Sequence, residues 1–375
     1  MTRSFRFRRL EARRTGGTRS QLELSYPLPR SPSGKVYQFS PNPDAVPRLF
    51  LIGSAPAERQ IRDEDRARIL RAPGPGQTVC PYTGHTAEDD EFVHFADIEA
   101  IKRQIGHDAV ADVSDWLGDL ARDFNRRQPR DSIISMTLEH KPSRRARPVT
   151  IREDLLRDLS CDVCRRSYGV YAIALFCPDC GAPNLALHFR REITLVHEQL
   201  AIAAVQDRGG HSELAYRLLG NAHEDVLTAF ETTLKAVYRH LARRREPDRA
   251  AELCSKKAVG TAFQSIKRGG KKFAEIGIDP YAVLSQEESD RMAINIEKRH
   301  VIGHNLAVAD EQYVALTQVE QPGETVHLVA EEIGRFADTC LRVITTLEGA
   351  LLPTTTTGGR CPPASASSSR PARRS

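Results

Sequence analysis

The segment that decides the fold is CDVC at residues 161–164, followed twelve residues later by CPDCG at residues 177–181. Each C-x2-C turn points two thiolates at one centre, and two such turns close a tetrahedral metal site. Gly181 frees the backbone where the chain must turn beneath the metal. The β-prone residues 169–176 lie between the pairs, as in a zinc ribbon. The pattern therefore predicts one structural zinc ion held by Cys161, Cys164, Cys177 and Cys180.

Four thiolates complete the coordination sphere of zinc and leave no position for a reacting water. A redox dithiol and a catalytic metal are the alternatives at these cysteines. Some ribbons contact nucleic acid or protein, whereas others only staple a subdomain, and the local sequence does not separate the two roles. If this ribbon makes such contacts, we expect them from Arg165, Arg166 and Tyr168.

A second cysteine segment, CPYTGH at residues 80–85, has the outline of a zinc knuckle with Thr83 in place of the second thiolate. A hydroxyl is a poor zinc ligand, although His85 and His94 could substitute for it. We interpret the segment as a degenerate ribbon in which the fold persists without the metal. Participation of Cys80 in a second metal site stays open, and the expected role of this cysteine is that of a small buried residue.

The composition is that of a globular protein, with 40% hydrophobic and 27% charged residues in 375, which is enough for two or three domains. No run of 18 apolar residues predicts a transmembrane helix, and the basic N-terminus lacks the apolar region of a secretory signal. We therefore expect a cytoplasmic protein with no membrane partner, whose clustered cysteines bind metal. The net charge of +5 is modest, but clusters of arginine and lysine either favour a polyanion partner or form solvated faces.

Composition and pattern divide the chain into five regions. Residues 1–34 are predicted to be a poorly ordered basic lead-in. Residues 35–150 form a mixed region with the degenerate ribbon, strands near 35–39, 48–52 and 133–138, and one or two amphipathic helices over 96–124 that Gly106 could interrupt. Residues 151–188 hold the zinc ribbon, residues 189–352 a helical bundle, and residues 353–375 a disordered tail. The expected fold is mainly α, with the antiparallel bundle preceded by the small β ribbon and the mixed region.

Apolar residues recur at helical spacing through the C-terminal half. Two stripes, at residues 193–203 and 214–241, precede a looser segment with glycines, and a last stripe covers residues 329–347. Before this last stripe, Ser285 followed by Glu288 is a capping-box pattern that predicts the start of another helix. Two helices, an insertion and two more helices predict an up-and-down bundle.

Late in the third of these helices, RHVIGHN at residues 299–305 places an arginine and two histidines within six positions. Arginine is a permanent cation with a planar donor fork, and histidine titrates near neutral pH, so together they suit phosphate chemistry. Arg299 and His304 match the R-x4-H motif of HEPN-domain ribonucleases, which prefer a polar residue after the arginine. The resemblance covers residues 189–352, and the ribbon resembles those fused to HEPN-like domains in bacterial defence and toxin proteins.

The resemblance implies a metal-independent endoribonuclease that cleaves single-stranded RNA to a 2′,3′-cyclic phosphate, as a toxin or phage-defence effector. In this interpretation His304 is a base or acid, Arg299 clamps the phosphate, and His300 assists as an orienter or second acid/base. We expect three supporting residues: Glu224, Asp225 and Asn305. The carboxylate of Glu224 or Asp225 could orient a histidine. Arg299 and His304 diverge by about 140° around one helix. In the HEPN family the bundle forms a homodimer in which two copies of the motif line one cleft, and the resemblance implies the same assembly here. We also expect a regulatory protein partner.

Four alternatives compete with an active nuclease, and in the first of them His300 and His304 are ordinary surface histidines. His300 and His304, four positions apart on one helix face, could bind a metal, although no carboxylate at ligand spacing completes that site. The motif could persist in a catalytically inactive scaffold that binds nucleic acid or a protein partner. The ribbon alone could bind duplex DNA, with an affinity that falls steeply as salt rises.

Overall fold

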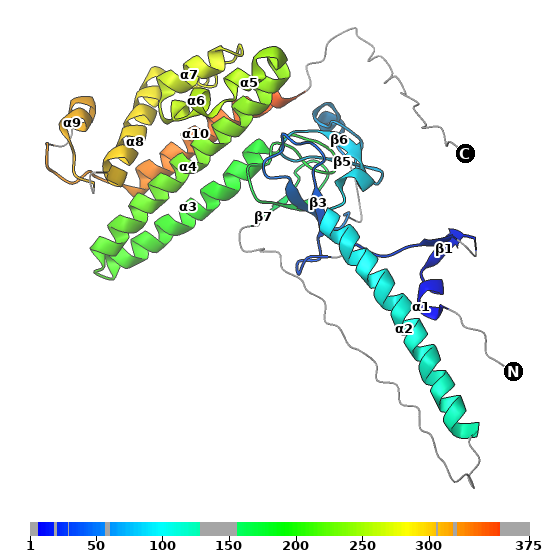
Figure 1. The fold of residues 1–375 in the computed structure, drawn as a ribbon. Helices are drawn as coiled ribbons and strands as arrows, with labels where there is room; N and C mark the ends of the chain where they lie inside the picture. Colours follow the sequence, from blue (N-terminus) through cyan, green and yellow to red (C-terminus); the bar gives the residue numbers. More distant parts are fainter. Residues whose placement is uncertain are drawn as a thin grey trace.

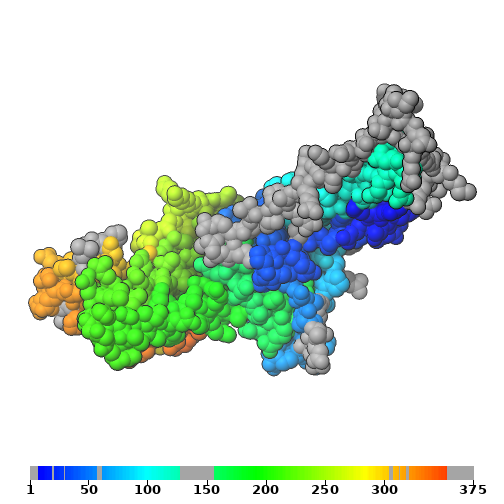
Figure 2. Space-filling view, turned by 90° about the horizontal axis from the view of Figure 1, so that it is seen from below, coloured from blue at the N-terminus to red at the C-terminus, as the bar shows by residue number. Residues whose placement is uncertain are grey.

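The computed structural model describes residues 7–18, 21–28, 30–56, 61–127, 156–304, 307–317 and 321–352. This part of the chain is mainly helical and carries three small antiparallel sheets, so the mainly α class is confirmed. The helical half occupies one end of an elongated molecule, and the N-terminal part occupies the other (Figure 1; Figure 2). None of the helices in the described ranges has the length and apolarity to cross a membrane. The strand predicted at 133–138 and the tail at 353–375 lie outside the described residues.

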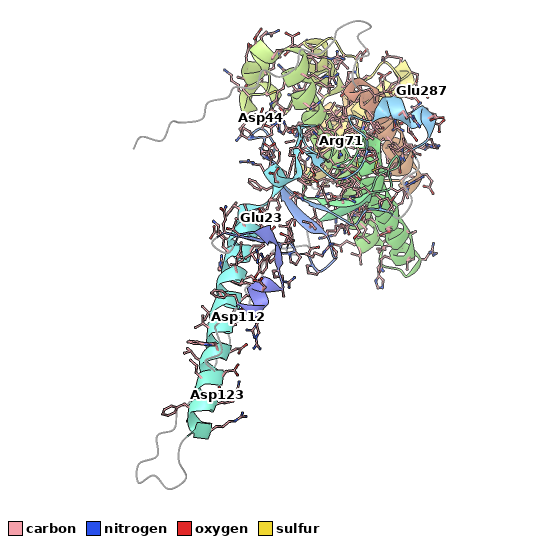
Figure 3. All side chains as sticks on the ribbon, turned by 90° about the vertical axis from the view of Figure 1, so that its right-hand side faces the viewer. Glu23, Asp44, Arg71, Asp112, Asp123 and Glu287 are labelled. Carbon is pink, nitrogen blue, oxygen red and sulfur yellow. The ribbon has the colours of Figure 1, made fainter. Side chains whose placement is uncertain are left out.

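The predicted lead-in contains regular structure in its described part, namely α1 (Arg8–Glu11) and a hairpin of β1 (Arg14–Gly17) with β2 (Leu22–Leu24). Its side chains are held by the next long element, α2 (Phe95–Arg127). The backbone N–H of Arg9 donates to Asp112 at 2.9 Å, and the Tyr26 hydroxyl donates to Asp108 at 2.9 Å. Figure 3 shows Asp112 halfway along α2, where α1 lies against it. The described part of the lead-in has regular structure, and α2 supplies acidic partners that hold it.

The helix α2 runs through Gly106 without interruption and projects away from the rest of the fold (Figure 1). One face bears the acidic residues that hold the lead-in. The opposite face leaves a row of apolar side chains exposed at alternating spacings of three and four: Val110, Val113, Leu117, Leu120 and Phe124.

The central sheet joins segments that are far apart in the sequence. Its strand order is β3–β4–β8–β7, from β3 (Val36–Phe39), β4 (Leu49–Ile52), β8 (Ser167–Val170) and β7 (Arg157–Ser160). The strands predicted near 35–39 and 48–52 are confirmed, and Phe50 of the second lies opposite Val170. Because β4 pairs with β8, the mixed region and the four-cysteine region share one sheet and one apolar core.

Near this sheet the chain forms a second hairpin and two short 3-10 helices. These elements are β5 (Gln77–Val79), β6 (Thr86–Glu88), η1 (Asp63–Arg68) and η2 (Asp89–Phe92). The CPYTGH segment of the degenerate ribbon connects the two strands of this hairpin. The Val79 N–H donates to the Pro178 carbonyl at 2.9 Å, and the Pro81 carbonyl accepts from Leu175 N–H at 2.8 Å. The CPYTGH segment is therefore tied directly to the second cysteine pair.

Three long helices form the main core of the C-terminal half: α3 (Leu185–Arg208), α4 (Ser212–Arg245) and α10 (Ala330–Leu351). A short turn ending at His211 joins α3 to α4, and the two helices run antiparallel (Figure 1). The predicted stripe at 193–203 is buried, as are Val226, Phe230 and Leu234 of the second stripe, whereas Leu214 at its start is exposed.

Short elements follow α4 before the chain returns to a long helix. They are η3 (Pro247–Arg249), α5 (Ala250–Leu253), α6 (Lys256–Val259), η4 (Ala262–Gln264) and α7 (Ile266–Ala274). The long helix is α8 (Gln286–His304), and α9 (Glu311–Thr317) lies between it and α10. The predicted capping box is present: Ser285 N–H donates to Glu288 Oε2 at 2.9 Å, and Glu288 N–H donates to Ser285 Oγ at 3.2 Å.

Candidate functional site

The four predicted zinc ligands converge in the interior. The Sγ atoms of Cys161, Cys164, Cys177 and Cys180 all lie within 4.8 Å of one another, and all four residues are buried. Cys161 Sγ is 3.8 Å from Cys180 Sγ, and Cys164 Sγ is 3.5 Å from Cys177 Sγ. A tetrahedral ion with metal–sulfur bonds of about 2.3 Å requires sulfur–sulfur distances of about 3.8 Å. The cluster therefore has the dimensions of a four-thiolate metal site.

The surroundings of the cysteines require a cation if the thiols are ionised. Burial raises the pKa of the Cys177 thiol well above its usual value, and the neighbouring sulfurs act in the same direction. A divalent ion removes this cost because it holds the thiolates in their charged form. The Asp179 N–H donates to Cys177 Sγ at 3.4 Å, which supports a negatively charged sulfur. Among the described residues, these cysteines form the one group with metal-ligand spacing.

Both cysteine pairs sit on turns of identical backbone pattern, and the degenerate segment repeats that pattern. We define the first turn as residues 80–85, the second as 161–166 and the third as 177–182. In each, the N–H of the leading cysteine donates to the carbonyl five residues on, at 2.7, 3.0 and 2.8 Å respectively. The carbonyl of each cysteine accepts from the N–H four residues on, at 2.9, 3.0 and 2.9 Å. The degenerate turn thus keeps the backbone of a knuckle.

The fifth residue of each turn adopts a left-handed conformation. It is Gly84 in the first turn (φ 74°), Arg165 in the second (φ 60°) and Gly181 in the third (φ 71°). Glycine is the residue that adopts such a φ without strain. An arginine in the second turn costs about 1 kcal/mol or more relative to glycine. In the first turn, the Thr83 hydroxyl accepts from Asn42 Nδ2 at 3.4 Å.

The predicted catalytic motif lies at the C-terminal end of α8. Arg299 is partly buried and His300 is exposed, while His304 is the last residue of the helix. Asn305 lies outside the described residues. The N-terminal neighbour of the motif, Lys298, donates to the His327 carbonyl at 2.9 Å and lies 3.4 Å from a carboxylate oxygen of Glu332. The motif therefore sits beside a second cation that already links α8 to α10.

Two carboxylates of α4 hold the Arg299 guanidinium. Its Nη1 lies 3.4 Å from Glu231 Oε2, and its Nε lies 3.7 Å from Glu224 Oε1. Glu224 and Glu231 are seven positions apart, so they share one face of α4. Glu224, expected to orient a histidine, instead pairs with the arginine. Asp225 accepts a hydrogen bond from Gln199 of α3 at 2.7 Å, so the structure does not bring it to the motif.

A histidine of α4 also reaches α8. His223 is buried, stacks on the ring of Phe336, and has Nε2 3.1 Å from Asn295 Oδ1. Burial lowers the pKa of His223 to about 4; the Asn295 hydrogen bond opposes this shift, whereas Lys298 and Arg299 add to it. The imidazole is therefore neutral at pH 7 and helps to fix α8 against α4. His223 therefore has a structural role beside the motif. Glu231 is the partner of Arg299 that the sequence analysis missed, and its only sequence signal is its spacing of seven positions from Glu224.

A groove of about 650 Å³ runs between α8, α9 and α10 on the side of Lys298. Its lining includes the cations Arg291, Lys298, Arg335 and Arg342 and the carboxylates Glu288, Glu332 and Asp338. Arg299 and His300 are not part of this lining. The groove therefore adjoins the motif along α8 and carries charges of both signs.

Comparison with known proteins gives no match: no protein-family model, no curated protein and no solved structure resembles the chain significantly. A function for this chain therefore has to be inferred from its own residues.

Proposed function

We propose that the chain is a metal-independent endoribonuclease whose chemistry is carried by Arg299, His300 and His304. The observation that supports the proposal best is the Arg299 guanidinium, fixed by two carboxylates of α4 next to an exposed histidine of the same helix. A guanidinium held in one orientation can receive a phosphate oxygen with little loss of side-chain freedom.

In the proposed reaction, a ribose 2′-oxygen forms a bond to the adjacent phosphorus, and the bond from that phosphorus to the 5′-oxygen of the next nucleotide breaks. The proton of the 2′-hydroxyl passes to a base, and an acid gives a proton to the leaving 5′-oxygen. His304 and His300 supply these two functions. Arg299 stabilises the charge that builds on the non-bridging oxygens. The products are a 2′,3′-cyclic phosphate and a 5′-hydroxyl end.

The test is cleavage of end-labelled single-stranded RNA in chelator by wild type, Arg299→Ala and His304→Ala. Each variant should cut about 10²- to 10⁴-fold more slowly, as expected for loss of a charge-stabilising cation or an acid/base. Matched controls are Arg291→Ala, on the same helix, and His211→Ala, an exposed histidine before α4; both should cut like wild type. A substrate with 2′-deoxyribose at the cleaved position should resist.

Intact RNA after incubation with wild type, or equal cutting by the two motif variants, would remove the nuclease proposal. RNA binding without cleavage would favour the inactive scaffold instead. The pairing of Arg299 with Glu224 and Glu231 also gives the arginine a structural role, which the inactive scaffold would share with the enzyme.

We also propose that the four-cysteine cluster binds one structural zinc ion. Its support is the sulfur–sulfur geometry and the two C-x2-C turns with the same hydrogen bonds. Zinc content measured after removal of free metal should be about one ion per chain and should fall in Cys161→Ser and Cys177→Ser. Cys80→Ser is the matched control and should retain the ion; loss of zinc in this control would place Cys80 in the metal site.

A homodimer through the C-terminal helices is the assembly that the proposed chemistry requires, because positions 299 and 304 are separated by about 140° around one helix. Light scattering coupled to size exclusion measures the mass of the purified protein directly. A monomer at all accessible concentrations would remove the shared cleft and would leave the nuclease proposal without a geometry.

A further inference from the structure

A cavity of about 320 Å³ lies where the second turn, the segment around η1 and the start of α3 meet. Its charged lining comprises Arg62, Arg68, Arg165 and Arg190 with the carboxylates Asp162 and Glu348. Four arginines from three separate segments thus line one small space. The cavity holds the volume of about ten water molecules, which is room for a phosphate group.

The two lining carboxylates are already engaged. Glu348 accepts hydrogen bonds from the Ala186 N–H at 2.7 Å and from Arg68 at 3.3 Å, so its carboxylate binds a free backbone N–H at the start of α3. Asp162 lies 3.8 Å from Arg190. Four lining arginines against two lining carboxylates leave an excess of two positive charges. Outside the lining, Arg62 pairs with Glu64 and Asp65, and Arg68 lies 3.0 Å from Asp65, so these two arginines contribute less of the excess charge than Arg165 and Arg190.

Arg165 is the independent observation that points to a ligand. It occupies the left-handed position that Gly84 and Gly181 fill in the other two turns. Its side chain is exposed and has no ion pair or hydrogen bond among the residues that the structure describes. Arginine at a position where glycine fits without strain suggests a contact of the side chain as the reason for its presence, which is the hypothesis tested below.

We propose that this cavity binds a phosphate group, with Arg165 and Arg190 as its principal donors. A guanidinium presents two parallel N–H groups that match two phosphate oxygens, and this geometry favours a phosphate group over a spherical anion such as chloride. The phosphate belongs either to a small phosphomonoester or to single-stranded RNA. The site lies on the metal-binding half of the fold and does not depend on cleavage at the α8 motif.

The test uses Arg165→Gly in the full-length, zinc-loaded chain. Glycine relieves the strained φ, so the melting temperature should stay the same or rise, while the affinity for phosphate should fall at least about tenfold. Calorimetric titrations use inorganic phosphate, a 5′-phosphorylated RNA oligonucleotide and the same oligonucleotide with a 5′-hydroxyl. Arg190→Ala should weaken binding similarly. Arg217→Ala, an exposed arginine of α4 paired with Glu213, should not.

Binding of inorganic phosphate and of the 5′-phosphorylated oligonucleotide alone supports a terminal or small phosphomonoester. Binding of both oligonucleotides supports backbone phosphate of RNA. The proposal is overturned if wild type binds none of the three probes, or if Arg165→Gly binds them as wild type does. It is also overturned if Arg165→Gly loses zinc and melts lower, because the arginine then serves the thiolate cluster. Cleavage by the Arg299 and His304 variants is measured separately, so either proposal can fail alone.

Discussion

Arg299 Nη1 of α8 lies 3.4 Å from Glu231 Oε2 of α4, and the same carboxylate oxygen accepts from Gln264 Nε2 at 3.2 Å. The other oxygen of Glu231 pairs with Lys235 one turn later on α4. Glu231 is 8% exposed, so this carboxylate joins α8, α4 and the short helix η4 in a nearly dry setting. Arg299 is therefore held by Glu231, a residue that also links α8, α4 and η4.

Glu231→Gln should lower the free energy of unfolding by about 1–3 kcal/mol, because it removes the charge that satisfies two partly buried cations. Urea unfolding followed by circular dichroism measures the change. Glu213→Gln removes the partner of Arg217 in an exposed pair and should cost less than about 0.5 kcal/mol. Equal costs for the two variants would show that Glu231 contributes nothing beyond a surface pair.

His223 should make the stability fall in acid. Burial lowers its pKa to about 4 in the folded chain, whereas an unfolded histidine titrates near about 6.5. Between these values the unfolded state binds a proton that the folded state does not, so this contribution is full above pH 6.5 and is lost as the pH falls toward 4. At pH 5 the loss amounts to about 2 kcal/mol.

The measurement compares wild type with His223→Gln, which cannot titrate, by urea unfolding at pH 7 and pH 5. The stability difference between the two proteins should shrink by about 2 kcal/mol at the lower pH. Acid effects on the cysteine cluster cancel, because both proteins carry it. A constant difference between wild type and His223→Gln at the two pH values would mean that the buried imidazole does not titrate in this range.

Gly181→Ala should be more harmful than Gly210→Ala, although both glycines have positive φ, at 71° and 80°. A Cβ at Gly181 would lie 2.6 Å from Leu70 Cβ, whereas one at Gly210 meets no atom within 4 Å. Backbone strain alone should cost Gly210→Ala about 1 kcal/mol. The added clash should raise the cost of Gly181→Ala to about 2–4 kcal/mol and weaken zinc retention. Thermal unfolding and zinc content are measured for both variants. An equal loss of stability in the two would contradict the predicted clash with Leu70 at Gly181.

The features that the sequence predicts well are local ones. Two C-x2-C turns carry their hydrogen-bond pattern within six residues each, and the Ser285–Glu288 cap closes within one helical turn. The pairing of Phe50 with Val170 has no local signal, because neither strand encodes its distant partner. Helix faces are predictable only to the nearest residue: Glu224 and Asp225 are adjacent, yet they point about 100° apart and serve different neighbours.

Arg165 differs from its counterparts in a way that the amino-acid sequence alone contains. When the three turns are aligned, arginine stands at a position that is glycine in the other two. The convergence of Arg62 and Arg190 on the same cavity has no such signal, since it depends on how η1 and α3 pack against the second turn. The sequence can therefore single out Arg165 as a candidate but cannot predict the site around it.

The shared cleft of the proposed homodimer predicts that two variants, each expected to be inactive alone, complement each other. A mixture of Arg299→Ala and His304→Ala chains, unfolded together and refolded with zinc, forms some dimers that hold one intact Arg299 and one intact His304. If the two copies face one cleft, these mixed dimers should recover measurable RNA cleavage, whereas each variant refolded alone should not.

The control mixture pairs Arg299→Ala with a chain that carries both substitutions. No dimer in it holds an intact Arg299, so it should stay inactive although its assembly is the same. Recovery in the first mixture and none in the second requires residues from two chains in one site. A lack of recovery in a mixture proven to contain mixed dimers would exclude a site shared between two chains. The separation of about 140° around α8 would then argue against Arg299 and His304 acting on one phosphate.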